Sequence, residues 1–533
     1  MKLSKLSEMR VAVVDCLGYG NRGKRLSTID VISVGPRLIA GILEDLNIQY
    51  EFYLYKEAIK EIENFRSYDV LLASGMATDL GSMIRLAKSF KGGTKIAGGP
   101  SCVEYKKLLM SGYDFVVFGE SEDKLPLIIK DLITYGDVIN NVEGLLRLKN
   151  GEVYGTLPTK YVVPEVLWKY KPSSSVIKKY DWWWGARTYI EVVRGCSNFY
   201  RPTLNLIRYP VCKNCGLCRE ADLESRIHCP LGIPPGCGYC SVPQIYGPAR
   251  SKPIDKVIDE VKDLIRVGVR RIVLSAPDFL DYGRDWLIKP KPLTDPRNPK
   301  PNLKVIEELL TKLFDISEIM SGDSYIMIEN IKPNLVDEEV AKLLGNYLKG
   351  STLGIGLETG DNVLHKALGR PSTVGEVVKA VKLLCRYGLK PHIYLIHGLP
   401  YEDRKSIKNT VNIVRKLSRL SIEKFTLYRF TPLKGTAFEG FQKPPAAVES
   451  SQARELYEVV KKYNVALKKR AIGSIVKAVI ASRKGPYLVA YPLPHGPVTL
   501  LKGPSCYIGN VVWVKLTKVA SDREMFGDVV KVA

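Results

Sequence analysis

Long hydrophobic runs are missing from this sequence of 533 residues. No apolar stretch approaches the roughly 18 residues of a membrane-spanning helix, and the N-terminal MKLSKLSEMRVAVVDCLG turns polar too soon for a secretory signal peptide. Acidic residues are also scarce beside basic ones, 56 against 79, which leaves a formal net charge of +23. We therefore expect a cytoplasmic protein without a transmembrane segment that either contacts an anionic partner or carries a solvated basic surface.

Disulfides are not expected either, because a chain without a secretion signal keeps its thiols reduced. The sequence nevertheless has 11 cysteines. Four are scattered and are interpreted as ordinary core residues: Cys16, Cys102, Cys385 and Cys506. The other seven fall within one short region: Cys196, Cys212, Cys215, Cys218, Cys229, Cys237 and Cys240. This clustering indicates metal or redox chemistry.

Strand-like and helix-like segments alternate along most of the chain, which indicates an α/β protein. Within a first domain, 1–145, short apolar strands between amphipathic helices predict a flavodoxin-like, doubly wound parallel sheet. Ligands of such sheets bind at the carboxyl ends of the strands. The corresponding loops are 16–32, 75–80, 97–102 and 119–122. Their candidate ligand-binding residues are Arg22, Lys24, Arg25, Gly75, Thr78, Gly98, Gly99, Gly119 and Glu120.

Two further domains are predicted after this sheet. A connector, 146–185, leads into a core, 186–445, in which six strand–helix repeats are interrupted by a cysteine-rich insert at 197–236. Six repeats predict a (β/α)6 partial TIM barrel with its chemistry at the carboxyl ends of the strands. A helical linker, 446–470, precedes a β-rich tail, 471–533, which predicts a small OB-like β-barrel.

Three of the clustered cysteines are expected at the mouth of the partial barrel. Cys196 ends the first core strand, and Cys237 and Cys240 follow the insert. Three thiolates leave one iron of a 4Fe-4S cluster open to another ligand. The alternative is a zinc site on the same three thiols.

The insert adds a second group of thiols. Three cysteines separated by two residues each, and a fourth ten residues later, form it: Cys212, Cys215, Cys218 and Cys229. This spacing predicts an auxiliary 4Fe-4S cluster. Structural zinc is one alternative, with His228 replacing a thiol. In another partition, Cys229 joins Cys237 and Cys240 while Cys196 pairs with the insert.

Several core motifs resemble those of the radical S-adenosylmethionine (SAM) superfamily. They run in the expected order over about 250 residues: EVVRGC, GCGYC, VPQIYGPARSKP, LSAPDFLDYG, GIGLETGDNVLHKALGRPST, LIHGLPYEDR and LYRFTPLKGTAFEG. The usual C-x3-C-x2-C is altered, because 40 residues separate Cys196 from Cys237. The resemblance implies a 4Fe-4S cluster whose open iron binds SAM and cleaves it to a 5′-deoxyadenosyl radical, which removes hydrogen from an unactivated carbon.

The same resemblance implies how SAM is held. Glu358 would contact the ribose, Arg370 the carboxylate end, and Gly398 with Pro400 the adenine edge. The alternative for Glu358 and Arg370 is a structural ion pair at the top of the barrel.

The flanking domains carry resemblances of their own. LLASGMATDLG, IAGGPSCVEY and YDFVVFGESED resemble the cobalamin-binding domains that precede many radical SAM cores, although GYGNRG stands where D-x-H-x-x-G is usual. This implies cobalamin bound without a histidine ligand, or loss of that cofactor. The tail resembles the TRAM module of tRNA methylthiotransferases, which would contact RNA or form a lid over the core.

Two substrate classes remain open. The domain order resembles archaeal enzymes of membrane-lipid maturation, including tetraether-lipid (GDGT) ring synthases that form cyclopentane rings, and implies an anionic lipid substrate and a peripheral place at the membrane. It also resembles tRNA methylthiotransferases and radical methylases, which implies a tRNA substrate. The N-terminal domain lacks the clustered cysteines of the methylthiotransferases, and we therefore favour the lipid. Either reaction needs a reductant such as ferredoxin; a non-catalytic iron–sulfur or RNA-binding protein is the third hypothesis.

Overall fold

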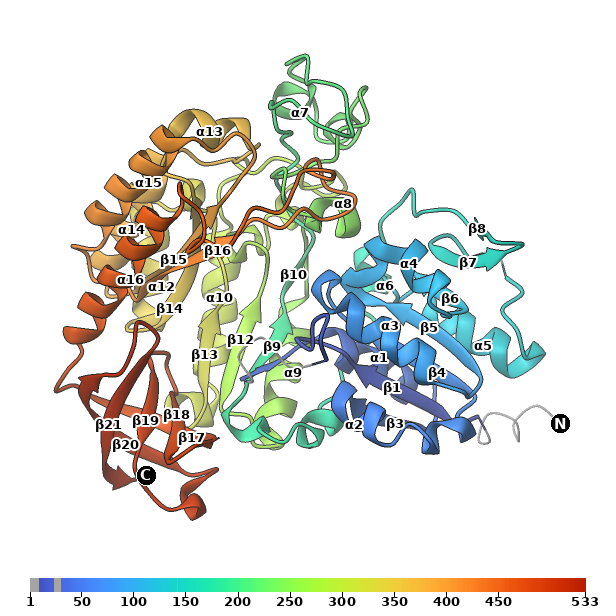
Figure 1. Ribbon diagram of the computed structural model, residues 1–533, viewed down its shortest axis with the longest axis horizontal. Coiled ribbons are helices and arrows are strands. Elements are labelled where there is room, and N and C mark those ends of the chain that lie inside the picture. Colours follow the sequence, from blue (N-terminus) through green and yellow to red (C-terminus); the bar gives the residue numbers. More distant parts are fainter. Residues whose placement is uncertain (1–8, 24–29, 141) are drawn as a thin grey trace. The chain divides into compact units, whose positions relative to one another are not determined.

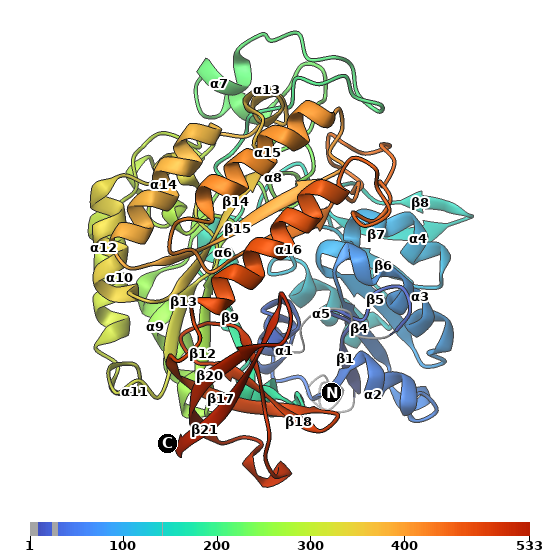
Figure 2. The ribbon, with the colours of Figure 1, turned by 60° about the vertical axis from the view of Figure 1, so that its left-hand side comes forward.

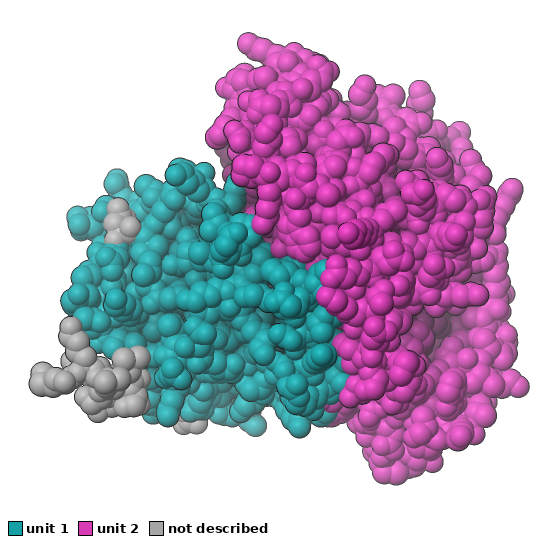
Figure 3. All heavy atoms as spheres, turned by 180° about the vertical axis from the view of Figure 1, so that it is seen from behind, with its two compact units in different colours: residues 1–183, 188–190, 252–267 teal, residues 184–187, 191–251, 268–533 magenta. Residues whose placement is uncertain are grey.

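The protein is described by a computed structural model covering residues 9–23, 30–140 and 142–533. Lys24 and Arg25 of the first predicted loop lie outside the described residues. The chain divides into two compact units, which Figure 3 distinguishes by colour. Unit 1 runs to Trp183 and also takes Thr188–Ile190 and Lys252–Val267, and unit 2 takes the rest. Among the helices of the described ranges, none has the length and apolar character that a membrane crossing requires.

Unit 1 contains a seven-stranded sheet in the order β3-β1-β4-β5-β6-β7-β8 (Figure 1). Its parallel strands are β1 (Val11–Asp15), β3 (Tyr50–Leu54), β4 (Val70–Ser74), β5 (Thr94–Gly98) and β6 (Phe115–Val117). Without the two-residue β2 (Val31–Ile32), their order is 2-1-3-4-5, as in open doubly wound sheets. An antiparallel hairpin, β7 (Leu145–Lys149) and β8 (Glu152–Tyr154), extends this sheet into the predicted connector.

Five helices of unit 1 connect these strands: α1 (Gly35–Asp45), α2 (Tyr55–Lys60), α3 (Leu80–Ser89), α4 (Tyr105–Met110) and α5 (Leu125–Tyr135). The helices α6 (Pro164–Leu167) and α9 (Ile254–Arg266) also belong to this unit. A buried ion pair fixes α9 to α1, because Arg37 Nη2 lies 2.9 Å from Glu260 Oε1 and both side chains are almost inaccessible to solvent. The pair specifies how α9 packs on α1, because a buried charge without its partner would strongly destabilise the fold.

The core of unit 2 has the predicted alternation of strands and helices. The strands are β9 (Arg187–Glu191), β12 (Arg271–Ser275), β13 (Tyr325–Ile328), β14 (Thr352–Glu358), β15 (Lys390–His397) and β16 (Lys424–Arg429). Only the first and last residues of β9 belong to unit 2. Two parallel groups, β12-β13 and β14-β15-β16, are linked by a bridge between Asn330 and Gly354. Just after β9, the Val192 N–H donates to the Ser275 carbonyl at 2.9 Å, which places the first strand beside β12.

Helices cover the outer side of these strands (Figure 2). They are α10 (Leu303–Phe314), α11 (Ser317–Met320), α12 (Glu338–Leu348), α13 (Asn362–Ala367), α14 (Val374–Arg386) and α15 (Arg404–Leu417). Five of them begin at an N-cap whose side chain accepts a backbone N–H: Asn302, Asp337, Asp361, Thr373 and Asp403. These polar residues end the preceding loops and satisfy helix donors that otherwise lack partners.

The tail forms a closed five-stranded barrel after the long helix α16 (Arg454–Lys469). Its strands are β17 (Ile475–Lys484), β18 (Tyr487–Pro492), β19 (Val498–Leu501), β20 (Val511–Val519) and β21 (Glu524–Val532). Tyr325, the first residue of β13, packs on one barrel face, and Lys477 Nζ donates to the Gly322 carbonyl at 2.7 Å. The barrel therefore lies at the amino-terminal end of the core strands, and it is not the lid over their carboxyl ends that the sequence left open.

Candidate functional site

A cavity of about 270 Å³ opens at the carboxyl ends of the core strands, and Cys196, Cys237 and Cys240 line it together. Cys196 follows the short hairpin β10 (Val193–Arg194) and β11 (Arg250–Ser251). The intervening Gly195 has φ +82°, and a Cβ there would meet the Pro248 carbonyl oxygen at 2.2 Å, so the turn requires glycine. Cys237 and Cys240 precede α8 (Val242–Tyr246) in a turn closed by the Cys240 N–H on the Cys237 carbonyl at 2.8 Å.

N–H groups surround these sulfurs. The Asn198 backbone N–H donates to Cys196 Sγ, and its side-chain amide donates to Cys237 Sγ, both at 3.4 Å. Burial raises the pKa of the Cys240 thiol to about 12, and Cys237 adds to the rise. Burial also raises the pKa of Cys196, against the lowering effect of Lys332. A metal overcomes that cost by binding the thiolates, and N–H donors to sulfur are typical of cluster ligands, so this donor set fits a 4Fe-4S cluster.

Glu358 and Arg370 line the same cavity and form an ion pair, the arrangement given above as the alternative to SAM binding, with 3.5 Å between Oε1 and Nη1. The register of β14 against β15 shifts between Gly356 and Glu358, and Glu358 takes φ +61°. Arg370 Nη2 donates to the Gly356 carbonyl at 2.6 Å and Nη1 donates to the Tyr239 hydroxyl at 3.2 Å. Within the described residues, its buried Nε has no hydrogen-bond partner. An unused donor in a cavity wall suits an anionic or carbonyl group of a bound molecule.

Gly398 and Pro400 are not among the residues that line this cavity. They follow β15, where Gly398 has φ +71° and a Cβ would meet Pro444 Cγ at 2.3 Å. The Gly398 N–H donates to Glu402 Oε2 at 2.6 Å. These contacts give Gly398 a role in closing the loop, and its contact with adenine remains a prediction.

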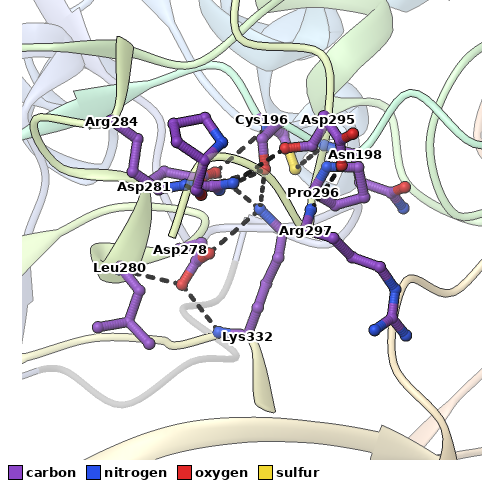
Figure 4. A network of polar contacts seen from close by, with 12 residues as sticks. Cys196, Asn198, Asp278, Leu280, Asp281, Arg284, Asp295, Pro296, Arg297 and Lys332 are labelled. Atoms are coloured by element: carbon purple, nitrogen blue, oxygen red, sulfur yellow. Dashed lines mark hydrogen bonds and ion pairs between the residues drawn. The ribbon is translucent and has the colours of Figure 1, made fainter. Parts of the chain in front are cut away.

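Sequence reasoning missed a buried ionic network beside Cys196 (Figure 4). Lys332 Nζ lies 2.7 Å from Asp281 Oδ2 and 3.2 Å from Asp278 Oδ2, and donates to Ser197 Oγ at 2.8 Å. Burial raises the pKa of Asp278 to about 6, against the opposing charge of Lys332. Burial also acts on Asp281, but Lys332 and Arg284 hold its pKa below the usual range. The two aspartates of the motif LSAPDFLDYG, Asp278 and Asp281, were the only sign of this network in the motifs quoted from the sequence.

The cysteines of the insert line a second cavity, of about 130 Å³. They are Cys212, Cys215, Cys218 and Cys229, and Cys218 belongs to the four-residue helix α7 (Leu217–Glu220). His228 and Arg201 line this cavity as well. In the ranges that the structure describes, no three His, Cys, Asp or Glu side chains are placed as ligands of one metal ion.

The predicted ligand loops of unit 1 meet at one edge of its sheet. Asp15 is in register with Ser74, and Ser74 with Gly98, so the loops after these strands are neighbours. A Cβ on Gly98 would meet nothing nearer than 4.0 Å, which leaves open space at this edge. The other predicted residues have structural surroundings. Gly99 packs against the backbone of Gly75, Thr78 lies in a short 3-10 helix, and Gly119 has φ +80°. Glu120 accepts the Val162 N–H at 2.8 Å, and Arg22 is exposed.

Comparison with known proteins identifies the core. The profile of the radical SAM superfamily matches residues 228–414. An uncharacterized protein of Methanopyrus kandleri is 36% identical over 98% of this chain and 96% of its own length. The chain belongs to the radical SAM superfamily. It is a radical SAM enzyme, a class that works with a 4Fe-4S cluster and SAM. Cys237 and Cys240 fall inside the matched segment, and Cys196 precedes it.

Two further similarities cover parts of this radical SAM chain. A probable threonylcarbamoyladenosine tRNA methylthiotransferase of Pyrococcus horikoshii is 26% identical over 46% of the chain and 53% of its own. The radical SAM methyltransferase TsrM of Kitasatospora setae, solved with cobalamin and a [4Fe-4S] cluster, superposes with a TM-score of 0.55 at 15% identity, over 82% of this chain and 76% of its own. At that identity, the second similarity describes the fold alone.

Proposed function

We propose that this enzyme uses a 5′-deoxyadenosyl radical to modify an unactivated carbon of an RNA, adding a methyl or methylthio group. The observation that carries the proposal is the single cavity that holds Cys196, Cys237 and Cys240 opposite Glu358 and Arg370. When bound on the three thiolates, a 4Fe-4S cluster supplies the electron that breaks the C5′–S bond of SAM. The electron comes from an external reductant such as ferredoxin. Cleavage would release methionine and a 5′-deoxyadenosyl radical, which would take a hydrogen atom from the RNA carbon and leave as 5′-deoxyadenosine. A second SAM would supply the methyl group, and a sulfide donor the sulfur of a methylthio group.

The chain's own residues would bind and orient SAM. Arg370 presents its buried guanidinium to the cavity, with Nε unpaired within the described residues, and suits the carboxylate of SAM. Glu358 lies beside it as a hydrogen-bond acceptor for the ribose hydroxyls. Burial raises the pKa of Glu358, against the lowering effects of the Arg370 charge and of the Tyr239 hydroxyl.

A basic surface supports RNA as the substrate class. Three lysines of α16, Lys461, Lys462 and Lys469, line a shallow surface depression of about 420 Å³ together with Glu458. The helix leads into the small β-barrel, and the net charge of the chain is +23. Rows of lysines bind phosphate backbones without reading sequence. The similarity to a tRNA methylthiotransferase favours the same substrate class.

Cobalamin at the sheet edge of unit 1 is part of this proposal for the methyl-transfer reaction. The open space over Gly98 supports it, because a planar corrin ring can lie against backbone only where no side chain stands in the way. Titration of the purified protein with hydroxocobalamin should give a bound species with an altered visible spectrum, and Gly98→Trp should abolish it. Unaltered spectra at saturating cobalamin would remove this cofactor from the reaction.

A second candidate function is tetraether ring formation in membrane lipids. Exposed apolar side chains on unit 2 favour it: Ile207 and Val211 of the insert are 57% and 52% exposed, and Val363 of α13 is 80% exposed. Such side chains suit contact with acyl or isoprenoid chains. The reaction would place the protein at the membrane surface.

One experiment separates these functions. Lipids and tRNA nucleosides from a strain lacking the gene are compared by mass spectrometry with those of the parent and of a strain complemented with the Cys237→Ala protein. Loss of one modified nucleoside in both mutant strains, with normal lipids, supports the RNA reaction. Loss of cyclised tetraethers with normal nucleosides would transfer the assignment to lipids.

A further inference from the structure

We infer that the insert binds a second iron–sulfur cluster, of the 4Fe-4S type, through Cys212, Cys215, Cys218 and Cys229. All four side chains line one cavity, whereas the other three clustered cysteines line the SAM cavity. Seven thiols therefore divide into four and three. The inference concerns the metal content of the insert and does not depend on the substrate proposed above.

The size of the cavity favours a cluster over a single ion. A tetrahedral zinc site has its four sulfurs in contact around one ion, with Zn–S distances of about 2.3 Å, and leaves no void. The cavity that these cysteines line together with other residues measures about 130 Å³, and within the described residues no three of their side chains converge as ligands of one ion. In a 4Fe-4S cluster each thiolate binds a different iron, so the sulfurs stand apart around a volume of this kind.

The backbone between the cysteines is shaped for such a ligand. Asn214 and Gly216, the neighbours of Cys215 on either side, both have left-handed conformations, with φ of +51° and +78°. Left-handed residues set among ordinary ones curl backbone N–H groups into concavities that are common at Fe–S sites. One such N–H is already directed at sulfur, since the Asn214 N–H donates to Cys212 Sγ at 3.4 Å.

A buried arginine holds the two ends of the insert together and adds positive charge to the cavity wall. Arg201 is 2% exposed and lines the cavity. Its guanidinium donates to the carbonyls of Phe199 at 2.7 Å, Ile227 at 2.8 Å and Ile233 at 3.2 Å. The segment that carries Cys229 is thereby fixed to the segment that follows Cys196. A fixed cation also stabilises the net negative charge of a four-thiolate cluster.

The two cavities share one short segment of chain. Asn198 lines the first cavity and Arg201 the second. Three residues of extended chain span at most about 11 Å. The second cluster would therefore lie near the first, but with four protein ligands it would have no open iron for SAM.

Metal analysis and spectroscopy of anaerobically reconstituted protein test this assignment. The intact protein should hold roughly eight irons per chain. A variant with alanine at Cys196, Cys237 and Cys240 should keep roughly four irons per chain. After chemical reduction it should give an EPR signal that added SAM does not alter. Cys506→Ala, which removes an exposed thiol of the small barrel, is the matched control and should keep the full iron content.

The complementary variant has alanine at all four insert cysteines. It should keep the EPR signal that SAM alters, and circular dichroism shows whether it is folded. Four irons and one zinc in the intact protein would overturn the assignment. An EPR signal that responds to SAM in the variant with alanine at Cys196, Cys237 and Cys240 would also overturn it. Loss of the SAM-responsive signal in a folded Cys229→Ala protein would instead establish the other partition and also overturn it. Each outcome is independent of whether any RNA is modified.

Discussion

Replacing Lys332 by methionine tests the buried network beside Cys196. The ammonium group lies 2.7 Å from Asp281 and 3.2 Å from Asp278, and both aspartate side chains are fully buried. Methionine keeps the length of the side chain and removes its charge, so the carboxylates lose their shared cation. Removal of one partner from a buried ion pair costs about 3–5 kcal/mol. Asp281 keeps Arg284, so most of the cost falls on Asp278.

The cost should depend on pH with a definite sign. Burial raises the pKa of Asp278 to about 6 in the native protein, and the unfolded value is near 3.9. Because the native state binds this proton more tightly, Asp278's contribution to stability falls as pH rises from about 4 through about 6. Without Lys332 the native pKa rises further. At pH 5.5 Asp278 is largely protonated in both proteins, and the cost of Lys332→Met should be smaller than at pH 8.

Hydrogen exchange read by mass spectrometry suits this measurement, because it reports local opening free energies in a chain too large for two-state melting. At pH 8, peptides covering β13 and Lys332 should lose roughly two to four powers of ten in protection, at 1.36 kcal/mol per power of ten. The control is Lys312→Met, which removes an exposed partner of Glu308 and should cost less than about 0.5 kcal/mol. Equal protection in the two variants, or a loss that does not shrink at pH 5.5, would refute the reasoning.

Three further substitutions test other parts of the structure. In Gly356→Ala the new Cβ would lie 2.3 Å from Glu358 Oε1, so SAM should bind roughly ten- to a hundredfold more weakly in equilibrium dialysis at unchanged iron content; unchanged affinity would contradict the role of Glu358. Burial raises the pKa of Glu402 to about 7, so local stability around α15 should fall as pH rises from about 4.5 through 7 and stay level in Glu402→Gln. Arg201→Met leaves buried carbonyls without donors and should cost the insert its iron while the SAM-responsive EPR signal remains.

The sequence predicted what depends on local pattern. Continuous apolar runs such as VAVVD and VLLAS became the buried strands β1 and β4, and the N-cap residues of the core helices were visible as Asp, Asn or Thr. The spacing of the cysteines along the chain also suggested a group of three and a group of four, and the same two groups line the two cavities. Contacts across long sequence separations were not predictable, because Lys332 and Ser197 stand 135 positions apart and no periodicity links them. The adenine role of Gly398 came from motif position, which does not specify that this residue packs on Pro444.

The place of the small β-barrel bears on how a substrate reaches the radical. The barrel packs at the amino-terminal end of the core strands, and the cysteine cavity opens at their carboxyl ends. The seven residues of β14 span about 23 Å at roughly 3.3 Å per residue. A small molecule cannot touch both ends, whereas a folded RNA is long enough to contact the barrel and the α16 lysines while one nucleotide enters the cavity. Binding and chemistry would then rest on separate residues, so charge changes at Lys461 and Lys462 alter RNA affinity and leave the cleavage of SAM intact.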